Sequence, residues 1–306
     1  METRDLVIVG GGPAGLTAGL YAARARLDVV LYERLSPGGQ VLSTDWVENW
    51  PGAVEGVSGF DLADKMRDHA LKFGLEIVSR EISGLSAEGG RLLLHHHGGQ
   101  VTAKAVILAM GASPANLGIP GEARLTGKGV SYCGTCDGPF YRDQTVVCFG
   151  GGDTAAEEAI FLTRFARKVY LAHRRDQLRA AAVLQERVLA NEKIEVLWSH
   201  APVSINGENG VQSVTMRNLK TGEQFDLPCD GAFVFVGTRP STGFCAGAVE
   251  LDQQGFIKTF GDQKTSMPGV FAAGDCCGKL LRQIVVAAGE GATAAYAAQR
   301  YLEEHE

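Results

Sequence analysis

The sequence predicts an α/β fold with two Rossmann-like dinucleotide-binding domains, the second inserted into the first. A strand, a glycine turn, a helix and a second strand follow one another at the amino terminus, and the same pattern returns near residue 145. The length of 306 residues is enough for roughly two domains that each bury a core. One such unit commonly holds one dinucleotide at the carboxyl ends of its strands, so we expect two such ligands.

The first unit starts with the apolar run 6–9, which predicts a strand. The run meets the fingerprint Gly10-x-Gly12-x-x-Gly15. Its glycines permit the turn, let the backbone approach a pyrophosphate, and let helix and strand pack closely. Residues 16–26 then predict a helix, and residues 29–32 predict a second strand, parallel to the first.

Glu33 ends this second strand, 18 residues after Gly15. A carboxylate there can accept hydrogen bonds from both hydroxyls of an unphosphorylated ribose, and the helix start offers N–H groups to the phosphates. The first site is therefore expected to bind FAD or NAD. The alternative is a glycine-rich turn that holds no ligand.

The second unit repeats the pattern with strands at 145–149 and 169–172 and a helix that runs to about residue 167. Its fingerprint is Gly150-x-Gly152-x-x-Ala155. The same helix start and loop are expected to hold a second dinucleotide.

The second unit lacks the acidic residue of the first. Counting 23 residues from Gly10 reaches Glu33, whereas counting 23 from Gly150 reaches His173, which is followed by Arg174, Arg175 and, about one helical turn on, Arg179. Guanidinium groups can bind a 2′-phosphate with forked, charge-assisted hydrogen bonds, which a carboxylate would repel. This site is expected to prefer NADPH to NADH; the alternative is a solvated basic helix start.

Two proline-containing links suggest where the chain passes between the domains. The apolar runs 105–109 and 233–236 each lead into such a link, so we expect crossings near Pro114 and Pro240. The last segment carries the string Val270-Phe271-Ala272-Ala273-Gly274-Asp275 and then a long helix of small residues from about 283 to 304, but no third fingerprint. We therefore expect one domain at 1–114 and 241–306, and the other at 115–240.

Cys133-Gly134-Thr135-Cys136 lies between the two fingerprints. Two intervening residues bring the sulfurs within bridging reach when the second cysteine begins a helical turn, and the helix end can favour a thiolate. A redox-active dithiol that alternates with its disulfide is expected here. A zinc site would need a second ligating pair, and the remaining cysteines lack that spacing. Asp137 beside the pair could move a proton to or from a thiolate; a turn-forming aspartate is the alternative.

Composition excludes several classes of protein. A net charge of -6 argues against a nucleic-acid binder, which needs a basic face. No apolar run approaches the roughly 20 residues of a membrane helix, and no secretion signal pattern is present. Seven cysteines, an odd number, fit a reducing compartment. We expect a cytoplasmic protein without membrane, nucleic acid or metal. The run His95-His96-His97 could suggest a metal, but a solvated strand or turn is expected instead, because consecutive strand residues face opposite sides.

Several strings carry a resemblance: Gly-Gly-Gly-Pro-Ala-Gly-Leu at 10–16, Gly38-Gly39-Gln40, Glu48-Asn49-Trp50-Pro51-Gly52, Cys-Gly-Thr-Cys-Asp-Gly at 133–138, His-Arg-Arg-Asp at 173–176 and Ala-Gly-Asp at 273–275. Together they resemble the low-molecular-weight thioredoxin reductases over essentially the whole chain. Met110 and Ser241 depart from that family's pattern, in which threonine and asparagine are usual.

The resemblance implies FAD at the first site and NADPH at the second. It implies Glu33 on the adenosine ribose, Gln40 and Asn49 near the flavin, Asp275 on the ribityl-phosphate part, and Arg282 and Gln283 against the ring. The residues expected at the FAD site are Gly10, Gly12, Pro13, Ala14, Gly15, Glu33, Gly39, Gln40, Asn49, Gly111, Asp275, Arg282 and Gln283. Those expected at the NADPH site are Gly150, Gly152, Asp153, Thr154, His173, Arg174, Arg175 and Arg179.

The resemblance also implies a mechanism. Hydride passes from NADPH to FAD, and the reduced flavin opens the Cys133–Cys136 disulfide. Cys136 is then the sulfur nearer the flavin, Cys133 attacks the disulfide of thioredoxin, and Asp137 is the general acid. Because cysteines and flavin belong to different domains, we expect a rotation about the two links. A homodimer is expected from the family.

Rival interpretations stay open. The same scaffold could reduce another protein or a small-molecule disulfide, act as a non-catalytic nucleotide-binding redox sensor, or transfer electrons as a flavin reductase or ferredoxin-type enzyme with an idle CxxC pair. Cys276-Cys277 could be a second redox pair, but adjacent thiols bridge only through a strained ring, so two passive cysteines are expected.

Overall fold

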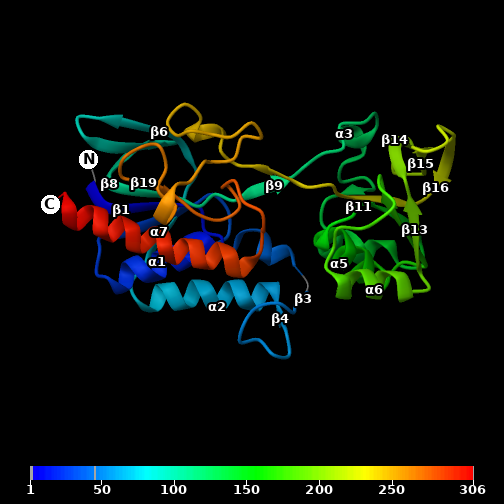
Figure 1. Cartoon of the computed structure of the whole chain (residues 1–306), viewed down its shortest axis with the longest axis horizontal. Helices are drawn as coiled ribbons and strands as arrows, with labels where there is room; N and C mark the ends of the chain where they lie inside the picture. Colours follow the sequence, from blue (N-terminus) through cyan, green and yellow to red (C-terminus); the bar gives the residue numbers. More distant parts are fainter. Residues whose placement is uncertain (1–2, 45, 306) are drawn as a thin grey trace. The chain divides into compact units, whose positions relative to one another are not determined.

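The computed structural model describes residues 3–44 and 46–305. The chain packs into two compact units, Met1–Ser113 with Arg239–Glu306, and Pro114–Thr238. Figure 1 shows the second unit as the green-to-yellow part of the chain. Two short paired strands lie at the crossings, β9 (Ala112–Pro114) and β18 (Thr238–Pro240).

The first unit is built on a seven-stranded sheet in the order β5-β2-β1-β8-β7-β6, with β19 also paired to β8. β1, β2, β5, β8 and β19 pair in parallel, whereas β6 and β7 form an antiparallel ribbon on β8. The bounds are β1 (Thr3–Val9), β2 (Val29–Glu33), β5 (Glu76–Ser79), β6 (Ile82–Glu88), β7 (Arg91–His96), β8 (Gly99–Leu108) and β19 (Val270–Ala272). A separate pair joins β3 (Trp46–Val47) to β4 (Val57–Ser58).

Three helices belong to this unit: α1 (Pro13–Arg24), α2 (Gly59–Lys72) and α7 (Ile284–Glu304). Alternate residues of β1 face opposite sides, so Leu6 and Ile8 pack with α1 and α7, while Val7 and Val9 face the β6–β7 side. α7 lies beside α1 in Figure 1, and a Cβ at Gly291 of α7 would collide with the carbonyl of Ala14. Small residues therefore let these two helices approach closely.

The second unit holds a five-stranded parallel sheet in the order β10-β17-β11-β12-β13. Its strands are β10 (Val130–Ser131), β11 (Thr145–Gly150), β12 (Lys168–His173), β13 (Ile194–Trp198) and β17 (Gly231–Phe235). Its helices are α3 (Glu122–Leu125), α4 (Gly134–Asp137), α5 (Asp153–Leu162) and α6 (Ala182–Ala190). An antiparallel sheet adds β14 (His200–Asn206), β15 (Ser213–Asn218) and β16 (Gln224–Pro228).

The fold class is the one predicted, and two local expectations were wrong. The helix after the second fingerprint ends at Leu162, and not near 167, because residues 163–166 turn back with backbone bonds to 160–162. The expected helical turn between Arg175 and Arg179 is absent, since the amides of Arg179 and Ala180 both donate to the carbonyl of Gly151. The next helix begins only at Ala182.

No helix among residues 3–44 and 46–305 combines the length and apolar character needed to cross a bilayer.

Candidate functional site

The first glycine loop leaves an open cradle at the start of α1. A Cβ at Gly15 would collide with the carbonyl of Gly10, and Gly10 itself has a φ of 105°, so both positions need glycine for the fold. Gly12 differs, because the nearest heavy atom to a Cβ built there is the Cα of Gly39, 4.0 Å away. α1 begins at Pro13, which has no N–H, and no side chain caps the helix, so the N–H groups that follow in its first turn need another partner. The cradle fits a pyrophosphate.

Glu33 closes the loop from the end of β2. Its Oε2 accepts a 2.6 Å hydrogen bond from the Gly11 amide, and its Oε1 accepts a 2.8 Å bond from the Leu35 amide. Each carboxylate oxygen can accept a further bond, so the carboxylate can hold the loop and still bind ribose hydroxyls.

Distant segments meet beside this cradle. A Cβ at Gly39 would lie 3.0 Å from the Cα of Gly12, and the Gln40 amide donates to the carbonyl of Ala112, next to Gly111. The Asn49 amide donates a 2.9 Å bond to the side chain of Gln283, the residue that precedes α7. Segments that the sequence marked separately are therefore gathered in one unit.

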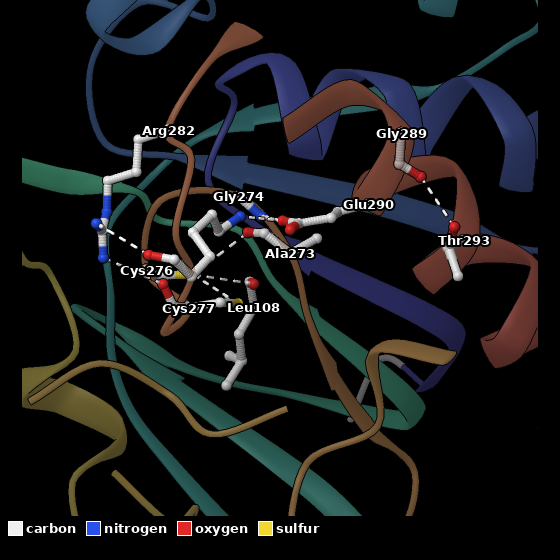
Figure 2. A network of polar contacts seen from close by, with 10 residues as sticks. Leu108, Ala273, Gly274, Cys276, Cys277, Arg282, Gly289, Glu290 and Thr293 are labelled. Atoms are coloured by element: carbon white, nitrogen blue, oxygen red, sulfur yellow. Dashed lines mark hydrogen bonds and ion pairs between the residues drawn. The ribbon is translucent and has the colours of Figure 1, made fainter. Parts of the chain in front are cut away.

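The turn after β19 carries Asp275 and is held by a buried ion pair. Glu290 of α7 accepts a 2.8 Å bond from the Gly274 amide (Figure 2). Glu290 also pairs with Lys279. Burial raises the pKa of Asp275, while the nearby charges of Lys279 and Arg282 oppose that rise. The Asp275 carboxylate therefore has two cations close by, Lys279 and Arg282.

Arg282 lies over the ring of Phe256 at 4.2 Å and donates long bonds to two carbonyls, at 3.4 and 3.5 Å. Its Nε is buried and has no hydrogen-bond partner within the described part of the chain. Arg282 and Lys279 also line a cavity of about 440 Å³, but its other walls come from residues 252–260 and Gly278, and none of the remaining residues expected at the FAD site lines it. The fit to a flavin therefore rests on the buried Arg282 Nε, a donor that suits a polar ligand atom, and on the open cradle at Gly12.

Cys276 and Cys277 are both fully buried, with their sulfurs 3.9 Å apart and not bonded (Figure 2). Cys276 donates to the carbonyls of Leu108 and Ala273. Contact with Cys276 and burial raise the pKa of Cys277. The pair therefore sits in the core as two free thiols.

The second glycine loop has the same design. Nothing lies within 4 Å of a Cβ built on Gly152, and α5 begins at Asp153 without a side-chain cap. Gly150 needs its small size, because a Cβ there would lie 2.6 Å from the Cβ of Ala155. Asp153 uses one oxygen to accept a 2.7 Å bond from the Ala181 amide, and Thr154 is exposed.

His173 lies beneath this loop, and the arginines lie at its rim. A Cβ on Gly151 would collide with the His173 ring, which is buried. Burial lowers the pKa of His173, and the charge of Arg179 adds to this. Arg174, Arg175 and Arg179 are all exposed and line one cavity of about 410 Å³. His173 therefore supports the loop from inside the unit, while the arginines are placed to meet a phosphate.

Cys133 and Cys136 form a disulfide, with Cα atoms 5.3 Å apart. The expectation that the second cysteine begins the helical turn was wrong, because α4 starts at Gly134 and Cys133 is its cap. The Cys136 amide donates to the Cys133 sulfur at 3.1 Å, a contact that favours a thiolate on Cys133 once the bond is opened.

Cys136 is exposed and Cys133 half-buried, so exposure alone does not assign their roles. Asp137 ends the turn, partly buried.

Several residues that position the cysteine pair and the Asp275 turn were not predicted from the sequence. Ser131 accepts a bond from the Cys133 amide at 3.1 Å, and buried Glu122 accepts from the Tyr132 hydroxyl at 2.8 Å. Glu290 and Lys279 were also missed. A serine before a CxxC pair, or a glutamate inside an alanine-rich helix, could have been noticed. Within the described residues, no cluster of three or more His, Cys, Asp or Glu side chains could hold a metal ion.

Comparison with known proteins gives consistent matches. The family described as pyridine nucleotide-disulphide oxidoreductase matches residues 4–291. A thioredoxin reductase of Peptoclostridium litorale is 46% identical over 306 residues, covering 98% of this chain and 97% of that protein. A bifunctional thioredoxin reductase/thioredoxin of Mycobacterium leprae is 45% identical over 98% of this chain, which spans 66% of that protein's length.

Solved structures match as well. The crystal structure of Lactococcus lactis thioredoxin reductase in the FR conformation has a TM-score of 0.96 and 40% identity, and the match covers 98% of this chain and 99% of that one.

Proposed function

Since the chain belongs to the pyridine nucleotide-disulphide oxidoreductase family, and within it to the low-molecular-weight thioredoxin reductases, we propose that it reduces thioredoxin with electrons from NADPH by way of FAD and the Cys133–Cys136 disulfide. The observation that carries the proposal is the Cys133–Cys136 disulfide at the start of a helical turn, in a chain with two open glycine cradles.

The two cradles differ in the charge at their rims, and this supports the choice of cofactors. Glu33 at the first cradle suits the free ribose of FAD, with the pyrophosphate at Gly12 and the ribityl-phosphate part near Asp275. Arginines at the second cradle suit the 2′-phosphate of NADPH. When bound, FAD would supply a carrier that accepts a hydride from NADPH and delivers two electrons to the disulfide.

The thiol chemistry follows from the helical turn. In the reduced pair, the Cys133 thiolate attacks the thioredoxin disulfide, which forms a mixed disulfide and releases one thioredoxin thiolate. Cys136 then attacks the Cys133 sulfur, which frees the second thioredoxin thiolate and restores the Cys133–Cys136 bond. Asp137, one residue after Cys136, is placed to pass a proton to a departing thiolate.

The FAD residues and the cysteines belong to different units. We therefore propose that the units change orientation during turnover, about the links at β9 and β18. A bifunctional crosslinker that joins the units should stop turnover without releasing the cofactor; full activity of the crosslinked enzyme would contradict it. A homodimer, and a cytoplasmic location that suits the five free cysteines, complete the proposal.

The first test is direct. The purified protein is expected to show a flavin spectrum and to oxidise NADPH much faster than NADH when oxidised thioredoxin is present. Absence of turnover with any disulfide acceptor would favour the redox sensor. The flavin reductase or ferredoxin-type interpretation would replace this one if the wild-type enzyme did not reduce thioredoxin and if wild type and Cys136→Ser oxidised NADPH equally fast with an electron acceptor of another kind.

A second test assigns the two sulfurs. The probe is a thioredoxin that keeps one active-site cysteine, activated as a mixed disulfide with an aromatic thiol. Cys136→Ser, which retains Cys133, should form a stable covalent complex with it, whereas Cys133→Ser should form little. The opposite result would exchange the proposed roles of Cys133 and Cys136.

A further inference from the structure

The turn between β15 and β16 lies beside the arginine cluster, although it belongs to a different sheet from the glycine loop. The link is Ser199, a buried residue with a φ of 58°. Its amide donates a 3.0 Å bond to the carbonyl of Arg175, and its carbonyl accepts a 2.7 Å bond from the Leu219 amide. This backbone chain holds Leu219 and the next residue, Lys220, next to the segment 174–179.

Lys220 and Leu219 line the same cavity of about 410 Å³ as the three arginines. Lys220 adds a fourth cation to the cavity wall, and Asp176 is the one acidic side chain that lines it. The Lys220 ammonium lies 3.5 Å from the Asp176 carboxylate, with both side chains mostly exposed at 66% and 73%. An exposed ion pair of this kind adds little to stability, so the lysine can exchange its partner for a phosphate of higher charge.

Leu219 gives the cavity an apolar surface, since 43% of this residue is exposed. A nucleotide has a flat apolar base as well as anionic groups, and binding sites for such ligands combine both kinds of surface. An exposed leucine between a lysine and three arginines therefore matches the adenine end of a 2′-phosphorylated dinucleotide better than it matches a free inorganic anion.

We propose that the β15–β16 turn completes the second dinucleotide site, with Lys220 as a further specificity residue for the 2′-phosphate and Leu219 as a contact for the adenine. The inference deepens the proposed use of NADPH and rests on it. In this arrangement Asp176 holds Lys220 at the rim before the nucleotide arrives and competes with the phosphate for it.

The test uses the full-length oxidised enzyme and two fragments, 2′,5′-ADP and 5′-AMP, with affinities measured by calorimetry. Lys220→Ala should weaken 2′,5′-ADP binding about 3- to 10-fold and leave 5′-AMP unchanged, as expected for the loss of one charge-assisted contact. Lys220→Arg should restore the affinity. Leu219→Ser should weaken both fragments alike, and Asp176→Asn should tighten 2′,5′-ADP alone.

Lys128→Ala is the matched control, because Lys128 is an exposed lysine of the same unit that does not line the cavity. It should leave both affinities unchanged. Arg175→Ala separates the two possible failures. If the wild-type enzyme binds both fragments equally and uses NADH as well as NADPH, the proposed donor is wrong and this inference falls with it. If Arg175→Ala loses the preference while Lys220→Ala keeps it, the proposed donor stands and the role of Lys220 is refuted.

Discussion

Lys279 and Glu290 form an ion pair that is largely removed from solvent, with side-chain exposures of 9% and 18%. The same Glu290 oxygen accepts a hydrogen bond from the Gly274 amide. One carboxylate on α7 therefore fixes both the turn that carries Asp275 and the loop that leads to Arg282. The geometry of the proposed flavin site depends on this contact from outside it.

Glu290→Gln should destabilise the first unit by about 1–3 kcal/mol, because the lysine is left buried without a counter-charge. The amide oxygen of glutamine can still accept from Gly274, so the effect isolates the lost charge. Urea unfolding measures it. The double variant Lys279→Met/Glu290→Gln should recover part of the loss, and equal stability of Glu290→Gln and wild type would show that the pair is not coupled to folding.

Gly12→Ala should fold normally and lose FAD, whereas Gly15→Ala should lose both stability and FAD. The reason is that a Cβ at Gly12 enters open space, while a Cβ at Gly15 collides with the carbonyl of Gly10. Thermal unfolding and the flavin content after gel filtration separate the two effects. Retention of FAD by a stable Gly12→Ala enzyme would mean that the pyrophosphate does not lie in this cradle.

Asp137→Asn should lower kcat with thioredoxin about 100-fold, the size expected for loss of a general acid. Asp143→Asn is the control, because Asp143 is an exposed aspartate of the same unit, and asparagine tolerates its φ of 59°. Thiol titration should still find the Cys133–Cys136 pair intact in both variants. Wild-type turnover by Asp137→Asn would leave Asp137 as a turn residue only.

The features that the sequence predicted best are those whose sequence signal lies within a few neighbouring residues. β1, β2, β11 and β12 each contain a short apolar run, and each glycine fingerprint ends the strand before it within a few residues. The cysteine pair is equally local, since its two members are three positions apart in the sequence. Such features need no knowledge of the rest of the chain.

What the sequence did not reveal depends on contacts between distant segments. Arg179 does not follow Arg175 by a helical turn, because its amide bonds to Gly151, 28 residues earlier in a neighbouring loop. Lys220 is held near the arginines by the backbone bonds of Ser199 and by its ion pair with Asp176. Glu290 reaches Gly274 from α7, which packs on α1. Periodicity and motif spacing carry no information on these pairings.

Cys276 and Cys277 should not react with a maleimide in the folded enzyme, whether or not NADPH is added, because both residues are at most 1% exposed. Reduction by NADPH should add only Cys133 and Cys136 to the labelled thiols. The double variant Cys276→Ala/Cys277→Ala should turn over at the wild-type rate, with a small loss of stability from lost packing. Labelling of either residue in the native enzyme, found by mass spectrometry, would instead favour a second redox pair.

The stability of the second unit should fall in mild acid because of His173. Its pKa is lowered in the folded protein by burial and by Arg179, so between the folded and unfolded values the unfolded chain binds the extra proton. The neutral ring therefore contributes stability above a pH of about 6.5, and this contribution is lost as the pH falls through the folded-state pKa.

Unfolding free energies measured from pH about 7.5 to about 5.5 should decline more steeply for wild type than for His173→Gln, which cannot titrate. His69→Gln, at an exposed histidine of α2, is the matched control and should keep the wild-type slope. Parallel slopes for wild type and His173→Gln would mean that the ring beneath Gly151 can take up a proton without cost, and that the glycine loop does not rest on a neutral histidine.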